Sequence, residues 1–322
     1  MKQLDYFIHI KNNNMFKYIR NMEWTTERIE AWKIDPKSYE RDFKLEVILN
    51  NEKDSIIDTP LINGFRSDIL FNYTSEEISN IIKLNKDPLI INKYQPLKLR
   101  DYQKEMLEDI SKNRFSILNV ARQIGTNTVV AHHILHYCLS NYDKVVQIFC
   151  INNTTCDNLY NNILDLLCKL PYHLQVGIKD FSLIDRTIHF SNGTRLIFTS
   201  NNTIGYNIDY LILPEFAFNT SSDKVITILL PTLYASSKSK ILIYSCPNKK
   251  DDCFHKMFID TDNAFYKNTY PYTIMNLPND DIFRTNMVAM FGEGSFITEY
   301  ECLFPGTSEY RDRKLQFILN KT

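Results

Sequence analysis

The sequence predicts an α/β fold in which helices flank a mainly parallel sheet. Between residues 97 and 275, short apolar segments alternate with longer segments of helical character, and this alternation is typical of βαβ units. The Ser191-Asn192-Gly193 turn signal between two apolar segments adds a hairpin. The composition agrees with a globular protein, because 44% of the residues are hydrophobic and 23% are charged.

The expected elements follow one another from residue 97 onward. The strands are short apolar runs, and the helices are the longer segments between them. After residue 275 we expect helical and irregular structure. The expected strands are 115–120, 144–151, 187–190, 194–199, 210–213 and 240–245, and the expected helices are 102–110, 127–139, 156–170 and 224–233.

The first 95 residues are expected to form a helical and irregular appendage, because they are polar and irregularly patterned. One helix is expected at 27–32 behind a Thr25 or Thr26 cap, and another opens after Ser75, with Ile78 on its apolar face. The chain is therefore divided into an appendage at 1–95, a core domain at 96–308 and a tail at 309–322.

Charge and cysteine content exclude several classes of protein. The formal net charge of -1 carries no overall signature of nucleic-acid binding, so any such contact requires a local patch. The seven cysteines include no Cys-x-x-Cys pair, and we interpret them as reduced thiols of a cytoplasmic protein. No stretch has the length of a membrane span, and the N-terminus lacks the apolar core of a signal peptide.

The segment between the first expected strand and the following helix is a candidate phosphate-binding loop. It reads Ala-Arg-Gln-Ile-Gly-Thr-Asn-Thr over residues 121–128. Such loops hold phosphates with backbone N–H groups and a helix N-terminus, a lysine reaches the β- and γ-phosphates, and the next hydroxyl binds Mg²⁺. Thr126 and Asn127 occupy those two positions here. Spacing alone leaves open an ordinary strand-to-helix turn with Gly125 at a tight corner.

Five sequence blocks, taken in order, resemble the ATPase domain of the large subunit of tailed-phage DNA-packaging terminases. Each block alone is a weak signal, but their order and spacing agree from roughly residue 24 to residue 308. They are Leu-Arg-Asp-Tyr-Gln at 99–103, the strand and loop at 118–125, the block at 205–218 that resembles Walker B, Ile-Leu-Ile-Tyr-Ser-Cys-Pro-Asn at 241–248, and the closing stretch at 296–308.

The resemblance implies a P-loop NTPase-like fold and a role for each matching residue. Gln103 would contact adenine, Arg122 would sense the γ-phosphate, Gly125 would let the loop approach the phosphates, and Glu215 would orient or deprotonate the attacking water. For Gln103 and Arg122, a structural role in the turn remains an equal alternative. The remaining implied residues are Gln123, Thr126, Asn127 and Thr128 in the nucleotide loop, and Ser245, Cys246, Pro247 and Asn248 in the motif that couples hydrolysis to movement.

The same resemblance implies cofactors, partners and a location. The cofactors would be ATP and Mg²⁺. The partners would be double-stranded DNA, the phage portal, the small terminase subunit and further copies of the chain in a ring, with no membrane. The location would be the cytoplasm of the infected bacterial host, at the procapsid portal vertex.

Three departures from the family pattern lead us to expect a degenerate ATPase site. Thr126 replaces the Walker A lysine, and Asn127 replaces the hydroxyl that binds Mg²⁺ unless Thr128 serves by a one-residue shift. Pro214 replaces the Walker B aspartate that anchors the metal, and no Gly-Lys-Ser or Gly-Lys-Thr occurs elsewhere. We expect the preceding strand to end by Leu213, with Pro214 just beyond the sheet. We also expect no nuclease domain. In the family that domain follows the ATPase domain, whose resemblance ends here at residue 308, and the sequence continues only to residue 322.

We therefore expect a terminase-like protein of viral DNA packaging that acts by binding DNA or protein partners. Two other functions remain open on sequence grounds. One is an active packaging motor whose nuclease is a separate chain, and the other is a structural virion protein that uses no nucleotide. Two further clusters favour a structural interpretation. Histidines 132, 133 and 136 lack the glutamate of a zinc-protease motif, and lysines 238, 240, 249, 250 and 256 suit solvated loops better than a DNA-binding patch.

Overall fold

The computed structural model describes residues 5–20, 61–66 and 80–319, with gaps. The gaps are 12–13, 63–64, 81–82, 85, 172–173, 175–177, 183–185, 201–207, 220–224, 228–232 and 234–237. The chain divides into two compact units, Met1–Ile78 and Ser79–Thr322.

The described elements of the N-terminal unit are strands. β1 (Asp5–Lys11) pairs with β2 (Asn14–Arg20) in an antiparallel hairpin, and β3 (Leu61–Ile62) pairs with β4 (Phe65–Arg66). These strands were not expected from the sequence. The helix expected at 27–32 lies outside the described residues, and of the one expected at 76–82 only Asn80, which is helical, is described.

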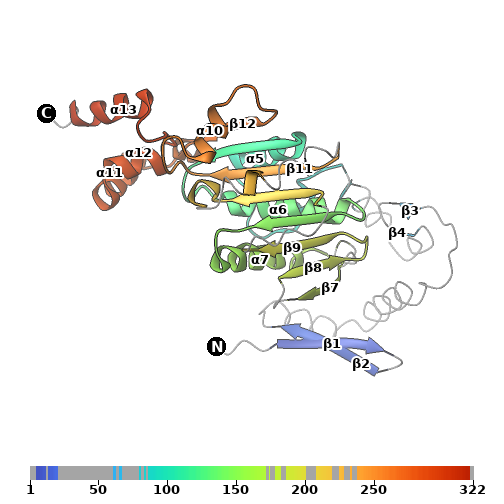
Figure 1. The fold of residues 1–322 in the computed structure, drawn as a ribbon. Helices are drawn as coiled ribbons and strands as arrows, with labels where there is room; N and C mark the ends of the chain where they lie inside the picture. Colours follow the sequence, from blue (N-terminus) through green and yellow to red (C-terminus); the bar gives the residue numbers. More distant parts are fainter. Residues whose placement is uncertain are drawn as a thin grey trace. The chain divides into compact units, whose positions relative to one another are not determined.

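The second unit is built on an eight-stranded sheet with the order β12-β5-β11-β10-β6-β9-β8-β7 (Figure 1). The six strands from β12 to β9 are parallel, and β8 and β7 continue antiparallel. The mainly parallel α/β fold is therefore confirmed. The strands are β5 (Phe115–Val120), β6 (Val145–Phe149), β7 (Ile178–Ser182), β8 (Thr187–Phe190), β9 (Arg195–Thr199), β10 (Tyr210–Pro214), β11 (Lys240–Ser245) and β12 (Tyr266–Tyr270).

The central strands are buried on both faces, which explains their mostly apolar sequences. Every residue of β5, β6 and β10 is buried. Helix α6 (Thr126–Ser140) packs between α5 (Asp101–Lys112) and α7 (Asn153–Cys168) and is buried along most of its length. Two sequence expectations need correction here. β7 and β12 were not expected, and α7 begins earlier than residue 156 because Asn152 caps it by accepting from the Thr155 N–H at 2.8 Å.

Helices follow the sheet, as expected after residue 275. They are α11 (Asp280–Phe291), α12 (Glu293–Glu299) and α13 (Ser308–Leu319), preceded by the short α10 (Cys253–Ile259), and α4 (Ile90–Tyr94) lies before α5. Two 3-10 turns, η3 (Phe216–Phe218) and η4 (Tyr272–Met275), follow β10 and β12. Of the helix expected at 224–233, the described residues 225–227 and 233 are helical.

The end of β10 differs from the expectation by one residue. Pro214 is the last residue of the strand, paired in register with Tyr244 of β11, whereas the pairing of β10 with β6 ends at Ile212. The prediction that the strand ends by Leu213 is therefore wrong. A proline has no N–H to donate, and a final position that is paired on one side tolerates it. Its place at the carboxyl end of the strand is as expected.

Candidate functional site

A cavity of about 580 Å³ opens at the carboxyl ends of the parallel strands, where open α/β sheets bind ligands. Its walls come from the β5–α6 loop, the β6–α7 connection, the turn after β10 and the end of β11. The lining residues are Val120, Ala121, Arg122, Gln123, Gly125, Thr126, Asn127, Ile151, Asn152, Glu215, Phe218, Tyr244, Ser245 and Cys246.

The β5–α6 loop is held by α5. The carbonyl oxygen of Ile124 accepts hydrogen bonds from the Tyr102 hydroxyl at 3.0 Å and from Gln103 Nε2 at 3.1 Å. Gly125 has a φ of 83°, and a Cβ there would lie 2.3 Å from Gln103 Nε2. Glycine is therefore required by both the backbone conformation and the close approach of α5.

The N-terminus of α6 points unsatisfied donors at the cavity. The N–H groups of Gly125, Thr126 and Asn127 donate to no residue in the described part of the chain. Thr126 is 8% exposed and lines the cavity, and its Oγ1 is buried without a hydrogen-bond partner among the described residues. A helix N-terminus carries partial positive charge, so this end of α6 favours an anion.

The residues at the family's metal position do not fit Mg²⁺. This ion takes oxygen ligands in near-octahedral geometry. The Tyr244 hydroxyl donates to Asn127 Oδ1 at 2.9 Å, which engages that oxygen, and Pro214 supplies no side-chain ligand. Glu215 is the one carboxylate among the lining residues. Within the described ranges, no group of three or more His, Cys, Asp or Glu residues is arranged to hold a metal.

Glu215 lies in a strained turn that is tied to the end of β11. Its φ of 51° is in the left-handed region, which is uncommon for a residue other than glycine. The Ala217 N–H donates to Ser245 Oγ at 3.2 Å, and Asn248 Nδ2 donates to the Ala217 carbonyl at 3.0 Å. These two hydrogen bonds link the Glu215 turn to the end of β11 and to the segment that follows it.

Arg122 is paired with a carboxylate on a different element. Its Nε lies 2.5 Å from Glu299 Oε2, and its backbone N–H donates to the Glu299 carbonyl at 2.8 Å. Arg122 thereby joins the loop to the C-terminal end of α12, and the Glu299 carboxylate lies against its guanidinium at the wall of the cavity.

The structure gathers eight of the thirteen expected site residues around the cavity: Arg122, Gln123, Gly125, Thr126, Asn127, Glu215, Ser245 and Cys246. Gln103 lies behind the loop with both ends of its amide engaged, since Oε1 also accepts from the Arg100 N–H. Four others do not line the cavity: Thr128, Pro214, Pro247 and Asn248.

Sequence reasoning missed three polar or aromatic lining residues. Asn152 was detectable as the cap of the helix after β6, and Phe218 lies three residues beyond Glu215. Tyr244 immediately precedes the expected coupling motif, but no local signal says that its hydroxyl reaches Asn127. Beside these residues, burial raises the pKa of the Cys246 thiol to about 11, against the opposing effect of Arg122.

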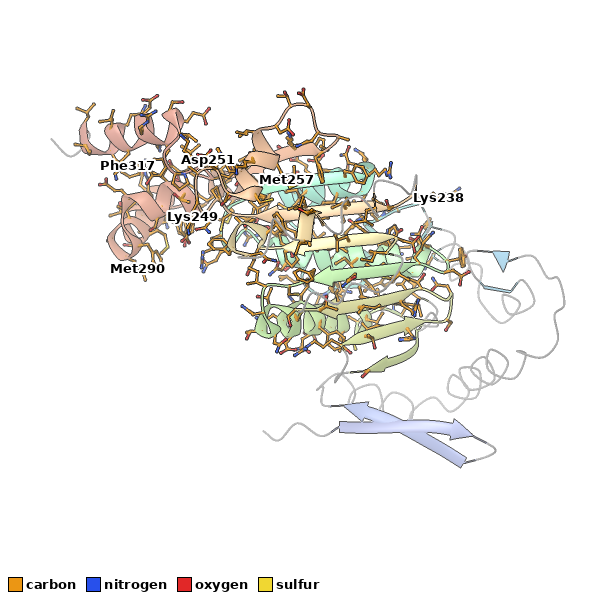
Figure 2. All side chains as sticks on the ribbon, viewed as in Figure 1. Lys238, Lys249, Asp251, Met257, Met290 and Phe317 are labelled. Atoms are coloured by element: carbon orange, nitrogen blue, oxygen red, sulfur yellow. The ribbon has the colours of Figure 1, made fainter. Side chains whose placement is uncertain are left out.

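The other clusters weighed on sequence grounds are dispersed or engaged. His132 Nδ1 contacts the Thr128 carbonyl at 2.8 Å, and His136 Nε2 contacts the Leu84 carbonyl. Lys238 and Lys249 lie at opposite ends of β11 (Figure 2). Lys240 is half-buried, its Nζ donates to the Ser111 carbonyl at 3.1 Å, and burial lowers its pKa to about 8. These lysines do not form one patch.

Comparison with solved structures identifies the fold. The chain is similar to the large terminase ATPase domain of Thermus phage P74-26, with a TM-score of 0.54, 13% identity and coverage of 67% of this chain and 96% of that domain. A mutant of that domain matches with a TM-score of 0.55 and 14% identity, covering 67% of this chain and 97% of the mutant domain. The HK97 bacteriophage large terminase gives 0.51 and 15%, covering 72% of this chain and 50% of that one.

These likenesses show that the second unit has the fold of a phage large terminase ATPase domain. The chain covers about half the length of the HK97 large terminase. No family model matches the sequence. Within the described residues, no helix combines the length and the apolar character needed to cross a membrane.

Proposed function

We propose that this chain is a terminase-like component of viral DNA packaging that acts by binding DNA or protein partners rather than by rapid ATP turnover. The fold supports the first part, because it is that of large terminase ATPase domains. The implied partners are double-stranded DNA, the portal, the small terminase subunit and further copies of the chain. The implied location is the host cytoplasm, at the portal vertex of the procapsid.

One observation carries the second part, namely the set of charges around the cavity. Phosphoryl transfer depends on positioning and on cations that neutralise the developing negative charge. Thr126 occupies the lysine position, and the guanidinium of Arg122 is paired with Glu299. At the position expected to bind the metal, Asn127 Oδ1 already accepts a hydrogen bond from Tyr244, and Pro214 has no side-chain oxygen. Removing one preorganised charge of this kind costs on the order of 10² to 10³ in rate, so we expect ATP turnover to be absent or very slow.

The test is steady-state phosphate release from Mg²⁺-ATP, with and without double-stranded DNA. We expect no DNA-stimulated release above the background of the buffer. Turnover approaching the median for enzymes, about 10 s⁻¹, would contradict the proposal. A parallel measurement of DNA affinity across a salt series tests the binding role, because each phosphate contact steepens the salt dependence.

A second candidate function is an active packaging motor whose nuclease is a separate chain. The strained Glu215 turn and its hydrogen bonds through Ala217 to Ser245 and Asn248 favour it. In a motor, these features would hold a water-activating Glu215 carboxylate in place and link it to β11. The phosphate-release assay separates the two candidates, since only a motor shows stimulation by DNA.

A further inference from the structure

The strongest ligand signal in the cavity is the unpartnered hydroxyl of Thr126. Burying a hydroxyl without a hydrogen bond costs about 1–3 kcal/mol on the scale of protein mutations. Thr126 Oγ1 is buried and has no hydrogen-bond partner among the described residues, and the Thr126 side chain lines the cavity. A ligand oxygen placed in the cavity would remove this cost.

The groups around Thr126 are donors. The N–H groups of Gly125, Thr126 and Asn127 end a helix of 15 residues whose burial keeps its axis in place. Because Asn127 Oδ1 accepts from Tyr244, its Nδ2 is the end of the amide that remains for a ligand, and no described residue accepts from it. Amides, a hydroxyl and a carboxamide NH₂ together recognise anionic oxygens.

The same donors oppose a metal-bound ligand. In a Mg²⁺-nucleotide complex, the metal is bound to phosphate oxygens, and its other ligands are oxygens of water or of one or two protein side chains. Asn127 presents N–H where such an oxygen would be needed, and Tyr244, which is 2% exposed, holds it in that orientation. A metal-free phosphate chain leaves all of its oxygens for the donors.

Gln103, which the resemblance assigns to adenine, is engaged by the backbone instead. Its Oε1 accepts from the Arg100 N–H and its Nε2 donates to the Ile124 carbonyl. Both ends of this amide are engaged by the chain's own backbone, and Gln103 does not line the cavity. Among the described residues, the donors at the N-terminus of α6 therefore point to recognition of the phosphates.

We propose that this cavity binds a diphosphate or triphosphate chain in its metal-free form, whichever base it carries, and that Mg²⁺ weakens the binding. This inference rests on the proposed function, in which the site is not a Mg²⁺-ATP engine. The shared chemistry is a polyphosphate, and inorganic pyrophosphate and the nucleoside diphosphates are its two sources.

Isothermal titration of the full chain with pyrophosphate, ADP and GDP in EDTA tests the proposal. We expect binding in EDTA, dissociation constants for ADP and GDP within about threefold of each other, and weaker binding once Mg²⁺ is in excess. Pyrophosphate binding comparable to ADP binding assigns the affinity to the phosphates, whereas binding by nucleotides alone would overturn that assignment. Binding that appears only with Mg²⁺ would overturn the proposal, and so would an absence of binding in EDTA.

Matched variants locate the contact. Thr126→Val removes the hydroxyl at nearly constant volume and should weaken pyrophosphate binding about tenfold or more, as expected for a hydrogen bond to a charged group. Thr126→Ser keeps a hydroxyl and should retain most of the affinity. The control is Ser116→Ala, because Ser116 Oγ is also buried and unpartnered but lies in β5 away from the cavity. Equal losses in Thr126→Ser and Thr126→Val would overturn the assignment to the hydroxyl.

Failure of this inference is distinguishable from failure of the proposed function. Rapid phosphate release in Mg²⁺ would contradict the proposed function whatever the EDTA titration shows. A chain that neither hydrolyses ATP nor binds polyphosphate in EDTA would leave the proposed function standing and overturn this inference.

Discussion

Arg122 and Glu299 are joined twice, by an ion pair with Nε 2.5 Å from Oε2 and by a hydrogen bond from the Arg122 N–H to the Glu299 carbonyl. The two side chains are 51% and 30% exposed. A pair this exposed contributes at most about 1 kcal/mol to stability. Its larger consequence is electrostatic, because Glu299 competes with any anion for the guanidinium at the wall of the cavity.

We expect Glu299→Gln to release Arg122 and to tighten pyrophosphate binding several-fold in EDTA, since charge-assisted hydrogen bonds to phosphate are strong. The unfolding free energy should fall by about 1 kcal/mol or less. Titration calorimetry and chemical denaturation measure the two effects. Glu301→Gln is the control, because Glu301 pairs with Arg313 of α13 at 2.6 Å. An affinity that is unchanged or lower in Glu299→Gln would contradict the idea of competition.

Restoring the lysine alone should not restore ATP turnover. In Thr126→Lys, the metal position still consists of Asn127, engaged by Tyr244, and of Pro214. The triple change Thr126→Lys, Asn127→Thr and Pro214→Asp supplies the cation, the hydroxyl and the carboxylate beside Glu215. We expect phosphate release from the triple variant and none from the single one. Hydrolysis by Thr126→Lys alone would show that the metal position is competent as it stands.

Gly125→Ala should damage the loop more than the same change at another glycine with positive φ. Both the left-handed backbone and the 2.3 Å approach of a Cβ to Gln103 Nε2 oppose it, and a residue held in such strain costs about 1–3 kcal/mol. Gly306→Ala is the control, since it has a φ of 79° but a Cβ there would meet only Lys250, at 3.4 Å or more. Thermal unfolding measures both, and equal losses would show that the contact with Gln103 is unimportant.

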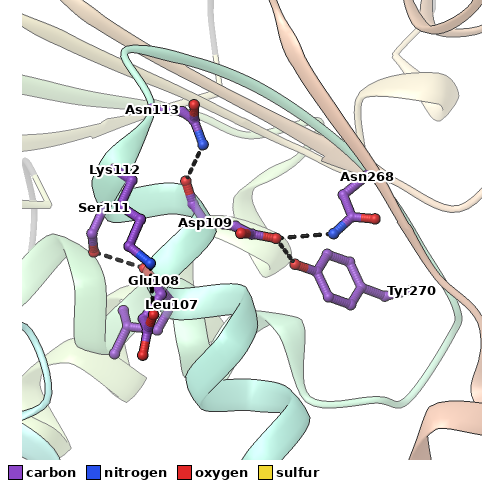
Figure 3. A network of polar contacts seen from close by, with 8 residues as sticks. All are labelled: Leu107, Glu108, Asp109, Ser111, Lys112, Asn113, Asn268 and Tyr270. Carbon is purple, nitrogen blue, oxygen red and sulfur yellow. Dashed lines mark hydrogen bonds and ion pairs between the residues drawn. The ribbon is translucent and has the colours of Figure 1, made fainter.

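The Asp109 carboxylate of α5, which contacts the edge strand β12, should make the stability of the fold depend on pH. Asp109 accepts from Asn268 Nδ2 at 2.9 Å and from the Tyr270 hydroxyl, which ties α5 to β12 (Figure 3). Burial raises the pKa of Asp109, but the hydrogen bonds from Tyr270, Asn268 and Tyr266 outweigh it, so the pKa lies below the ordinary value of 3.8.

Because the folded-state pKa is lowered, this stabilisation is fully present above about pH 4 and is lost as the pH falls through the folded-state value. At pH 7 we expect Asp109→Asn to lower the unfolding free energy by on the order of 2 kcal/mol and to flatten the acid limb of the stability curve. Asp101→Asn is the control on the same helix, because Asp101 is 94% exposed and forms an ion pair with Lys104, one helical turn away. Parallel acid limbs for Asp109→Asn and the unsubstituted chain would contradict the assignment.

The elements that sequence alone determined are those whose local pattern and tertiary environment agree. Strands β5 and β11 begin and end at the expected residues, since a strand buried on both faces is mostly apolar and stands out from its polar surroundings. The turn at Asn192 and Gly193 makes the β8–β9 hairpin as expected, because Gly193 supplies a φ of 81°. The strand-loop-helix setting of the cavity likewise follows from local signals.

Tertiary structure decided the features that depend on a distant partner. β12 reads Tyr-Lys-Asn-Thr-Tyr, with no apolar run to mark it. It forms a strand because it pairs with the edge of β5 and because the Tyr270 hydroxyl donates a hydrogen bond to Asp109. Likewise, no local pattern states that Glu299 lies against Arg122 or that Tyr244 reaches Asn127 across 117 residues of sequence. Local sequence specifies backbone conformation over a few residues, whereas the chemistry of this cavity depends on which side chains the completed sheet brings together.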